Sequence, residues 1–230
     1  MKKIIITQSN YVPWKGYFSS LSSVDEFIIY DDMQYTRRDW RNRNLIKTPQ
    51  GLKWLTIPVE VKGKYYQKIN ETKVSNKNWT IDHLNQIKQN YKSAKCFNDF
   101  FPWVENLYLN CNFDLLTEVN QYFILEINNI LNISTPIIRS EQFVLAHDRS
   151  ERLLNICLER GATDYYSGPA AKAYMNEDLF KSNNVNIHYF DYSGYPQYNQ
   201  LYDPFEHSVT ILDLILNEGK EAINYLKLYK

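Results

Sequence analysis

The chain has 230 residues, of which 44% are hydrophobic and 23% are charged, and this is enough to close the core of an ordinary globular domain. Its 26 basic side chains balance its 26 acidic ones, which argues against nucleic acid or an anionic membrane surface as a partner. Three widely spaced cysteines and the lack of any long apolar run argue against a disulfide framework, a signal peptide and a membrane span, so we expect a cytoplasmic protein without membrane insertion.

The first predicted elements are a strand, a loop, a helix and a second strand. Residues 3–7, KIIIT, form a short apolar run typical of a buried strand, and residues 17–24 have the spacing of an amphipathic helix. Another apolar run at residues 26–32 follows directly. This order within about 30 residues is typical of a βαβ unit, which predicts a parallel sheet with right-handed crossovers.

The later elements continue this alternation around a helical middle. Apolar residues at spacings of three and four predict helices in residues 78–133, which we interpret as a helical insertion or subdomain. We expect a strand at residues 52–61 paired with residues 65–74, strands at residues 136–143, 163–168 and 186–192, and helices at residues 150–160 and after residue 208. The sequence therefore predicts a single α/β domain over residues 1–230, built on a central, mainly parallel sheet.

The loop after the first strand is the first candidate binding segment. It lies at the predicted carboxyl edge of the sheet, where α/β proteins bind ligands, and Gly16 would let a ligand come close. The alternative is a tight loop with its aromatic side chains folded under it. The predicted substrate-binding residues here are Gln8, Asn10, Tyr11, Trp14, Lys15, Gly16 and Tyr17.

The second polar segment, YDDMQYTRRDWRNRN at residues 30–44, follows the next predicted strand. Arginine guanidinium groups bind phosphate or carboxylate through two parallel hydrogen bonds. Aspartates can orient such arginines or bind magnesium. A solvated charged face is the alternative, although the interleaved aromatic residues favour a binding segment. We predict catalytic roles for Asp31 and Asp32, and substrate binding by Arg37, Arg38, Trp40, Arg41, Asn42 and Arg43.

Two later segments complete the predicted site. The stretch TDYYSGPAAKAYM places small residues where backbone amides can face an anion and Lys172 can neutralise it, although a plain helix start has the same pattern. The four histidines lack metal-ligand spacing, so we predict no metal site, and for His147 and His207 a structural role is favoured over a proton shuttle. The turn-rich stretches DYSGYPQYNQ and DPFEHS, within residues 191–208, could bind a polar ligand by stacking and hydrogen bonding or could merely close the edge of the sheet. Together these segments add Lys172 and His207 as catalytic candidates, and Ser167, Gly168, Tyr195 and Gln197 as substrate-binding candidates.

Several long motifs resemble the WbqC-like family of bacterial O-antigen and polysaccharide gene clusters. They are TQSNYVPWKGYF, FIIYDDMQYTRRDWRNRNLIK with GLKWLTIPV, SERLLNICLERGATDYYSGPAAKAY and DYSGYPQYNQLYDPFEHSVTILDLILNEG. The family's opening usually reads Gln-Pro, and Ser9 replaces that proline here. The resemblance implies a role in the biosynthesis of lipopolysaccharide O-antigen or another surface polysaccharide, with glycyl or other aminoacyl transfer onto an amino sugar.

A more distant resemblance is to the nucleotidylyltransferase-like, or HUP-like, folds that bind ATP phosphates with an HxGH motif. The first strand, its polar loop, the Trp14-Lys15-Gly16-Tyr17 stretch and the acidic end of the next strand follow that arrangement, but aromatic residues replace both histidines. The resemblance points to ATP with magnesium as the cofactor to test. It also implies that Lys15, the arginines or Lys172 supply the missing positive charge.

The leading hypothesis is an enzyme that transfers an acyl or aminoacyl group to the amine of a nucleotide-linked amino sugar or another small anionic substrate. The first alternative is a nucleotide-sugar binding or scaffold protein, because no pair of nucleophile and base is evident. The second alternative is a nucleotidylyltransferase. Each hypothesis requires the aromatic and arginine-bearing segments to converge on one anionic ligand.

Overall fold

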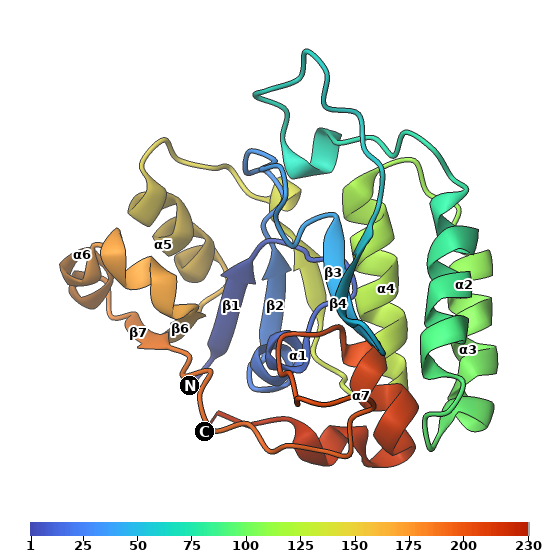
Figure 1. The fold of residues 1–230 in the computed structure, drawn as a ribbon. Coiled ribbons are helices and arrows are strands. Elements are labelled where there is room, and N and C mark those ends of the chain that lie inside the picture. Colours follow the sequence, from blue (N-terminus) through green and yellow to red (C-terminus); the bar gives the residue numbers. More distant parts are fainter. Residues whose placement is uncertain (230) are drawn as a thin grey trace.

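A five-stranded parallel sheet lies at the centre of the computed structural model, which describes residues 1–229 (Figure 1). The strand order is β5-β2-β1-β6-β7, and every pairing in this sheet is parallel. The bounds are β1 Lys3–Thr7, β2 Glu26–Ile29, β5 Ile137–Arg139, β6 Asp164–Ser167 and β7 Asn186–Tyr189. The predicted α/β class with a mainly parallel central sheet is confirmed.

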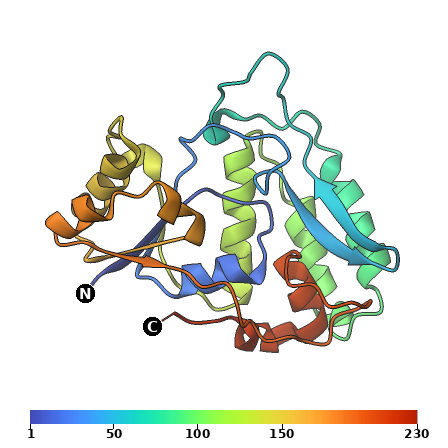
Figure 2. The same cartoon turned by 60° about the vertical axis from the view of Figure 1, so that its left-hand side comes forward.

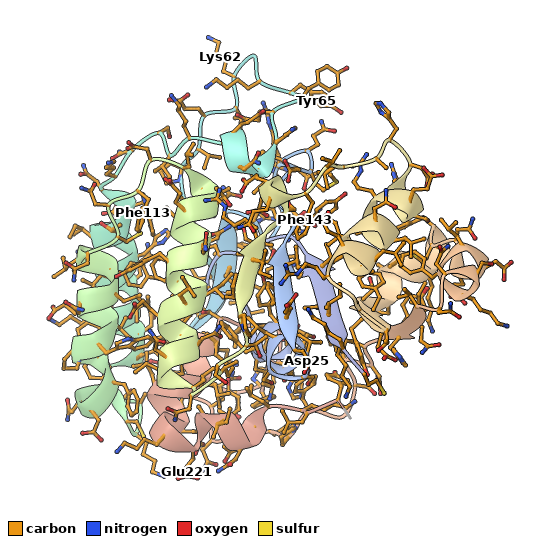
Figure 3. All side chains as sticks on the ribbon, turned by 180° about the vertical axis from the view of Figure 1, so that it is seen from behind. Asp25, Lys62, Tyr65, Phe113, Phe143 and Glu221 are labelled. Atoms are coloured by element: carbon orange, nitrogen blue, oxygen red, sulfur yellow. The ribbon has the colours of Figure 1, made fainter. Side chains whose placement is uncertain are left out.

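Burial on both faces of the sheet explains why continuous apolar runs form its strands. Ile4 and Ile6 belong to one core cluster and Ile5 to the other, and none of the three is more than 5% exposed. Strands that are covered on both faces need apolar side chains at every position. Figure 3 shows the strand direction, because Asp25, just before β2, and Phe143, after β5, lie at opposite ends of the sheet.

Helices cover the two faces of the sheet. α1 Lys15–Ser22 connects β1 to β2, and its Phe18 belongs to the same core cluster as Phe27 of β2. α5 Arg149–Glu159 and α6 Glu177–Ser182 cover the other face, where Leu154 and Phe180 share a cluster with Ile4. The short 3-10 helices are η1 Ile69–Glu71, η2 Ser140–Gln142, η3 Pro169–Ala173 and η4 Gly219–Tyr225.

The predicted helical middle of the chain forms three helices that lie together on one side of the molecule in Figures 1 and 3. They are α2 Trp79–Tyr91, α3 Phe97–Leu109 and α4 Leu116–Ile130, and α7 Ile211–Glu218 contacts α3. Their treatment as a subdomain within a single domain stays a prediction. No helix within residues 1–229 has both the length and the apolar character needed to cross a bilayer.

An antiparallel hairpin, β3 Arg43–Thr48 and β4 Gly51–Thr56, forms a separate sheet that lies beside the helices in Figure 2. The expected pairing of residues 52–61 with residues 65–74 is wrong, apart from one bridge between Val59 and Val74. The tight turn between Thr48 and Gly51 explains why β4 pairs with β3 and not with the later segment. Thr48 Oγ1 donates to the Gly51 carbonyl at 2.8 Å, and Gly51 has a φ of 103°, which favours glycine.

Candidate functional site

A cavity of about 620 Å³ opens at the carboxyl ends of β1 and β6. The chain leaves β1 toward β2 on one side and reaches β6 on the other, so the winding reverses between these two neighbours. Open α/β sheets bind ligands at such a reversal, and pockets of about 300–1,000 Å³ are typical. We call it the strand-end cavity, lined by Ile6, Thr7, Gln8, Tyr30, Asp32, Met33, Gln34, His147, Arg149, Arg152, Leu153, Tyr165, Ser167, Gly168, Ala170, Ala171 and Tyr174.

Arg149 and Arg152, at the start of α5, bring positive charge to the lining. Arg152 donates from Nε to the Ala146 carbonyl at 2.7 Å and from Nη2 to the His147 carbonyl at 2.9 Å. Its Nη1 lies 3.3 Å from the Tyr30 hydroxyl. Within residues 1–229, neither arginine has a carboxylate oxygen within 4.0 Å. Guanidinium groups without a carboxylate partner are suited to an anionic ligand.

Asp32 supplies a carboxylate to the same lining. Its Oδ2 accepts a hydrogen bond from Ser140 Oγ at 2.5 Å, and its Oδ1 lies 3.8 Å from Lys68 Nζ. These contacts orient the carboxylate while leaving its side chain 11% exposed. No group of three or more His, Cys, Asp or Glu side chains in residues 1–229 could hold a metal ion. A divalent cation at Asp32 would therefore take its other ligands from neutral protein oxygens, water or a bound molecule.

The last residue of β6 and the first residue after it, Ser167 and Gly168, are predicted site residues that line the cavity. Ser167 Oγ accepts a hydrogen bond from the Tyr165 hydroxyl at 3.4 Å. Lys172 follows in η3, but its side chain is exposed, its Nζ lies 5.0 Å from the centre of the Tyr189 ring, and it does not line the cavity. The structure therefore separates Lys172 from the two residues with which the sequence grouped it.

Asp31 has a different environment from its neighbour Asp32. It is 1% exposed and accepts hydrogen bonds from Ser9 N at 2.8 Å, Ser9 Oγ at 2.6 Å and Thr117 Oγ1 at 2.6 Å. Burial raises the pKa of Asp31. The carboxylate ties the opening loop and α4 to the end of β2, and it does not line the strand-end cavity.

Arg41 joins the two predicted polar loops. It donates from Nη2 to Gln8 Oε1 at 2.5 Å, and from Nη1 to Asn10 Oδ1 and to the Ser9 carbonyl, the latter at 3.4 Å. Gln8 lines the strand-end cavity, whereas Asn10 lines a smaller pocket described below. The two loops therefore meet at Arg41, beside the cavity and not inside it.

Two tyrosines of the first candidate segment, one in the loop after β1 and one in α1, belong to the core. Tyr11 is fully buried, and its hydroxyl lies 2.9 Å from His83 Nδ1 and 2.6 Å from the Tyr108 hydroxyl. Tyr17 is 7% exposed and belongs to the same core cluster. Neither ring lines the strand-end cavity, so the alternative expectation of a loop with buried aromatics describes these positions.

Gly16 makes room for Trp14. A Cβ at Gly16 would lie 2.1 Å from the Trp14 ring, so the absence of a side chain admits this ring and not a ligand. The Trp14 ring lies 5.4 Å from the Tyr192 ring and 5.3 Å from the Tyr195 ring, centre to centre. Trp14 and Tyr195 therefore contact one another and do not line the strand-end cavity.

Lys15 lies in a closed cage of aromatic rings. Its Nζ donates to the Pro196 carbonyl at 2.6 Å and lies 5.1 Å from the Tyr198 ring centre and 5.6 Å from that of Phe205. Burial lowers the pKa of Lys15 to about 8, and the charge of Asp213 opposes this shift. Asp213 accepts a hydrogen bond from the Tyr198 hydroxyl at 2.6 Å. We call Lys15, Tyr195, Tyr198, Phe205 and Asp213 the Lys15 cluster.

His207 lies beside the Lys15 cluster, with its ring centre 4.6 Å from that of Phe205. Burial and the charge of Lys15 lower the pKa of His207. Its Nδ1 is buried and has no hydrogen-bond partner among the described residues. Gln197 is exposed. Neither His207 nor Gln197 lines the strand-end cavity.

The rest of the second polar segment also lies outside the cavity. Arg37 donates to the Val61 carbonyl at 3.1 Å, and the Arg43 guanidinium lies 4.0 Å from the centre of the Trp54 ring. These contacts are with the hairpin and the loop that follows it. The predicted residues of this segment that do not line the strand-end cavity are Asp31, Arg37, Arg38, Trp40, Arg41, Asn42 and Arg43.

The segment that brings His147, Arg149 and Arg152 to the cavity is not among the segments predicted from the sequence. The sequence does contain a signal for it. The stretch LAHDRSER follows a predicted parallel strand, as the first two candidate binding segments do, and ligands bind at this edge of such sheets. Asp148 marks the helix start there, since its side chain accepts a hydrogen bond from Ser150 N at 2.8 Å. His147 was considered and was assigned a structural role.

Comparison with known proteins gives one consistent result. The model of the WbqC-like protein family matches residues 8–225. The Mycobacterium tuberculosis protein named "Uncharacterized protein Rv1507c" is 47% identical over 227 residues, which cover 99% of this chain and 98% of that protein. No solved structure matches this chain. The chain therefore belongs to the WbqC-like protein family.

Proposed function

We propose that the protein binds a nucleotide-linked amino sugar, or another small anionic substrate, in the strand-end cavity and transfers an acyl or aminoacyl group to its amine. The observation that carries the proposal is the placement of Arg149 and Arg152, without carboxylate partners among the described residues, in a cavity at the reversal point of the sheet. The family resemblance extends the proposal to the biosynthesis of O-antigen or another surface polysaccharide in the cytoplasm.

The lining offers a distinct contact for each part of such a substrate. Arg149 would bind phosphate through its guanidinium fork, and Arg152, whose Nε and Nη2 donate to backbone carbonyls, would add positive charge beside it. Asp32 would receive the ammonium of the amino sugar or, together with phosphate oxygens, a magnesium ion. Tyr30 and Tyr174 present aromatic rings for the sugar or base.

Amide formation requires the amine to lose a proton. The amine nitrogen attacks the carbonyl carbon of an activated acyl donor, a C–N bond forms, and the bond to the leaving group breaks with its electron pair. His147, an exposed residue of the cavity lining, would take the released proton. The donor would arrive already activated, or ATP would activate it as an acyl adenylate.

A product assay tests this reaction. Purified protein is mixed with ATP, magnesium, glycine and a nucleotide-linked amino sugar, and mass spectrometry detects a glycyl group added to the sugar. Arg149→Ala should lower kcat/KM about tenfold or more, whereas Lys172→Ala, which removes a cation outside the lining, should leave it within about twofold. Lack of product with a panel of amino acids and other acyl donors would contradict the proposed transfer.

Binding of a nucleotide sugar without chemistry is the second candidate function. It is favoured by Ser167, the serine of the lining, whose hydroxyl contacts Tyr165 and not a histidine, and by the burial that raises the pKa values of Cys111 and Cys157 to about 12. Calorimetry that finds tight binding of a nucleotide sugar, together with a negative product assay, would support this function. Pyrophosphate release without any amine acceptor would instead indicate a nucleotidylyltransferase.

A further inference from the structure

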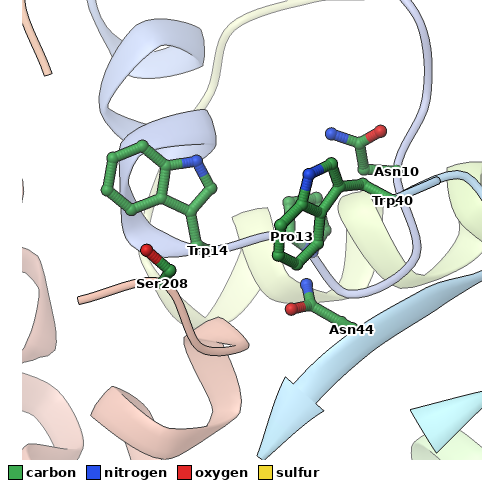
Figure 4. Close-up of a pocket in the computed structure, with 6 residues that line it drawn as sticks. All are labelled: Asn10, Pro13, Trp14, Trp40, Asn44 and Ser208. Carbon is green, nitrogen blue, oxygen red and sulfur yellow. The ribbon is translucent and has the colours of Figure 1, made fainter. Parts of the chain in front are cut away.

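A second, smaller pocket lies beside the opening loop. It has a volume of about 170 Å³ and is shown in Figure 4. We call it the tryptophan pocket, lined by Asn10, Pro13, Trp14, Trp40, Asn44 and Ser208. Its volume is well below the range of about 300–1,000 Å³ typical of whole small-molecule sites, so it is suited to a single ring.

Each of the two tryptophan rings of this pocket packs against a neighbouring aromatic ring. The Trp14 ring contacts Tyr192 at 5.4 Å, and the Trp40 ring lies 5.2 Å from the Trp54 ring, centre to centre. Trp40 is nevertheless 39% exposed. A tryptophan that packs on another ring and stays partly in water offers an apolar face to a ligand.

The orientation of Asn10 follows from its partner. Arg41 donates to Asn10 Oδ1, and a guanidinium can only donate, so the Asn10 amide nitrogen must face the other way. Figure 4 shows this nitrogen and the indole nitrogens of Trp14 and Trp40 facing the same opening between the two rings. None of these three nitrogens donates a hydrogen bond to the part of the chain that the structure describes. The tryptophan pocket therefore offers several free N–H donors.

The rest of the lining is neutral. Asn44 donates to the Val12 carbonyl at 2.7 Å and accepts from Leu45 N at 2.7 Å, so its amide is bonded within the protein. Ser208 adds a hydroxyl, and no charged side chain is part of the lining. This composition contrasts with the arginines, histidine and aspartate of the strand-end cavity. It fits a ligand with an apolar ring face and several neutral acceptor oxygens.

We propose that the tryptophan pocket is a carbohydrate subsite that binds one uncharged pyranose ring. The apolar face of the ring would pack on Trp40 or Trp14, and its hydroxyl oxygens would accept hydrogen bonds from the indole and Asn10 nitrogens. Arg41 links this subsite to the strand-end cavity, because the same guanidinium bonds Asn10 and, at 2.5 Å, Gln8. The inference does not depend on the proposed acyl transfer, since it concerns binding of a sugar with no donor present.

The experiment titrates the purified protein with methyl glycosides of neutral hexoses and of N-acetylhexosamines. Tryptophan fluorescence and saturation-transfer NMR report binding. We expect at least one glycoside to bind with a dissociation constant of about 0.1–10 mM, as suits one ring in a shallow pocket. Trp40→Ala should weaken it about tenfold, whereas Tyr66→Ala, which removes an 84% exposed ring outside the pocket, should leave it unchanged.

Asn10→Asp is the sharper variant. The aspartate keeps an oxygen acceptor for Arg41 but lacks the N–H donors, so it should lower glycoside affinity about tenfold while the protein stays folded. The inference is overturned if no glycoside of the panel binds, or if both pocket variants bind it like the wild type. Nucleotide binding by the wild type is measured in parallel. If the wild type binds no nucleotide while Trp40→Ala and Asn10→Asp weaken its glycoside binding, the result counts against the proposed function and leaves this inference standing.

Discussion

The strand-end cavity and the Lys15 cluster are made from the same kinds of side chain, yet they differ in how those side chains are satisfied. Each combines at least one cation with a carboxylate and tyrosines. In the Lys15 cluster the ammonium is bonded to the Pro196 carbonyl and is buried. In the cavity, Arg149 is exposed and has no carboxylate partner among residues 1–229. Free hydrogen-bonding capacity beside open space, and not residue type, distinguishes a binding site from a polar core.

The largest expected effect on stability comes from replacing Asp213 in the Lys15 cluster. Its carboxylate is fully buried and accepts hydrogen bonds from Tyr91 at 2.7 Å, Tyr198 at 2.6 Å and Gln200 at 2.9 Å. Asp213→Ala leaves these donors unpaired, so the free energy of unfolding should fall by about 3–5 kcal/mol in urea denaturation. Asp213→Asn, which keeps one acceptor oxygen, should lose less. A loss below about 1 kcal/mol for the alanine variant would show that the cluster does not hold the fold together.

A second closed polar group, Tyr11 with His83 and Tyr108, should make stability depend on pH. Burial lowers the pKa of His83 to about 4 from a usual value of 6.5. Between these values the unfolded chain takes up a proton that the folded chain does not, so stability falls as the pH is lowered through this window. The free energy of unfolding should therefore fall by about 3 kcal/mol between pH 7 and pH 4 through His83 alone.

The measurement compares unfolding of the wild type and His83→Gln in denaturant at both pH values. Because other groups also titrate, the relevant quantity is the difference between the two proteins. We expect the variant to lose less stability than the wild type on acidification. Equal losses would place the His83 imidazole in water or give it a charged partner in the folded protein, contrary to the structure.

A substitution in the strand-end cavity should weaken ligand binding and leave the stability of the protein nearly unchanged. Arg149→Ala should weaken binding of a nucleotide or nucleotide sugar about tenfold in calorimetry, since it removes one charge-assisted contact. The free energy of unfolding should stay within about 0.5 kcal/mol of the wild type, because the side chain is exposed and holds nothing in place. A large loss of stability with unchanged binding would reverse the roles that we assign to the two regions.

The smallest effect is expected at Lys172. Its ammonium lies over the Tyr189 ring at 5.0 Å and outside the cavity lining. Lys172→Ala should therefore leave nucleotide affinity within about twofold and stability within about 0.5 kcal/mol. A tenfold loss of affinity would mean that η3 moves on binding and carries Lys172 to the ligand.

The comparison also shows how far local patterns reach. The candidate residues that the structure brings to the cavity are Gln8, Asp32, Ser167 and Gly168, and all lie at or just after the carboxyl ends of predicted parallel strands. The same rule applied to residues 144–152 would have found Arg149 and Arg152. The pairing of β4 with β3 was not predicted. β3 begins at the end of the charged segment 30–44, so it was not recognised as a strand, although its residues Asn44 to Thr48 are buried.

The sequence by itself determined the parallel central sheet and the order of its strands and helices, and it indicated the edge of the sheet at which we propose that a ligand binds. Apolar runs and their periods are local properties, and they persist whatever the distant chain does. Only the tertiary structure decided which polar side chains remain free. Lys15 forms a hydrogen bond with Pro196, Asp31 with Thr117, and Tyr11 with Tyr108, and each partner lies far away in the sequence. Whether a polar group is satisfied depends on these partners, and no local pattern names them.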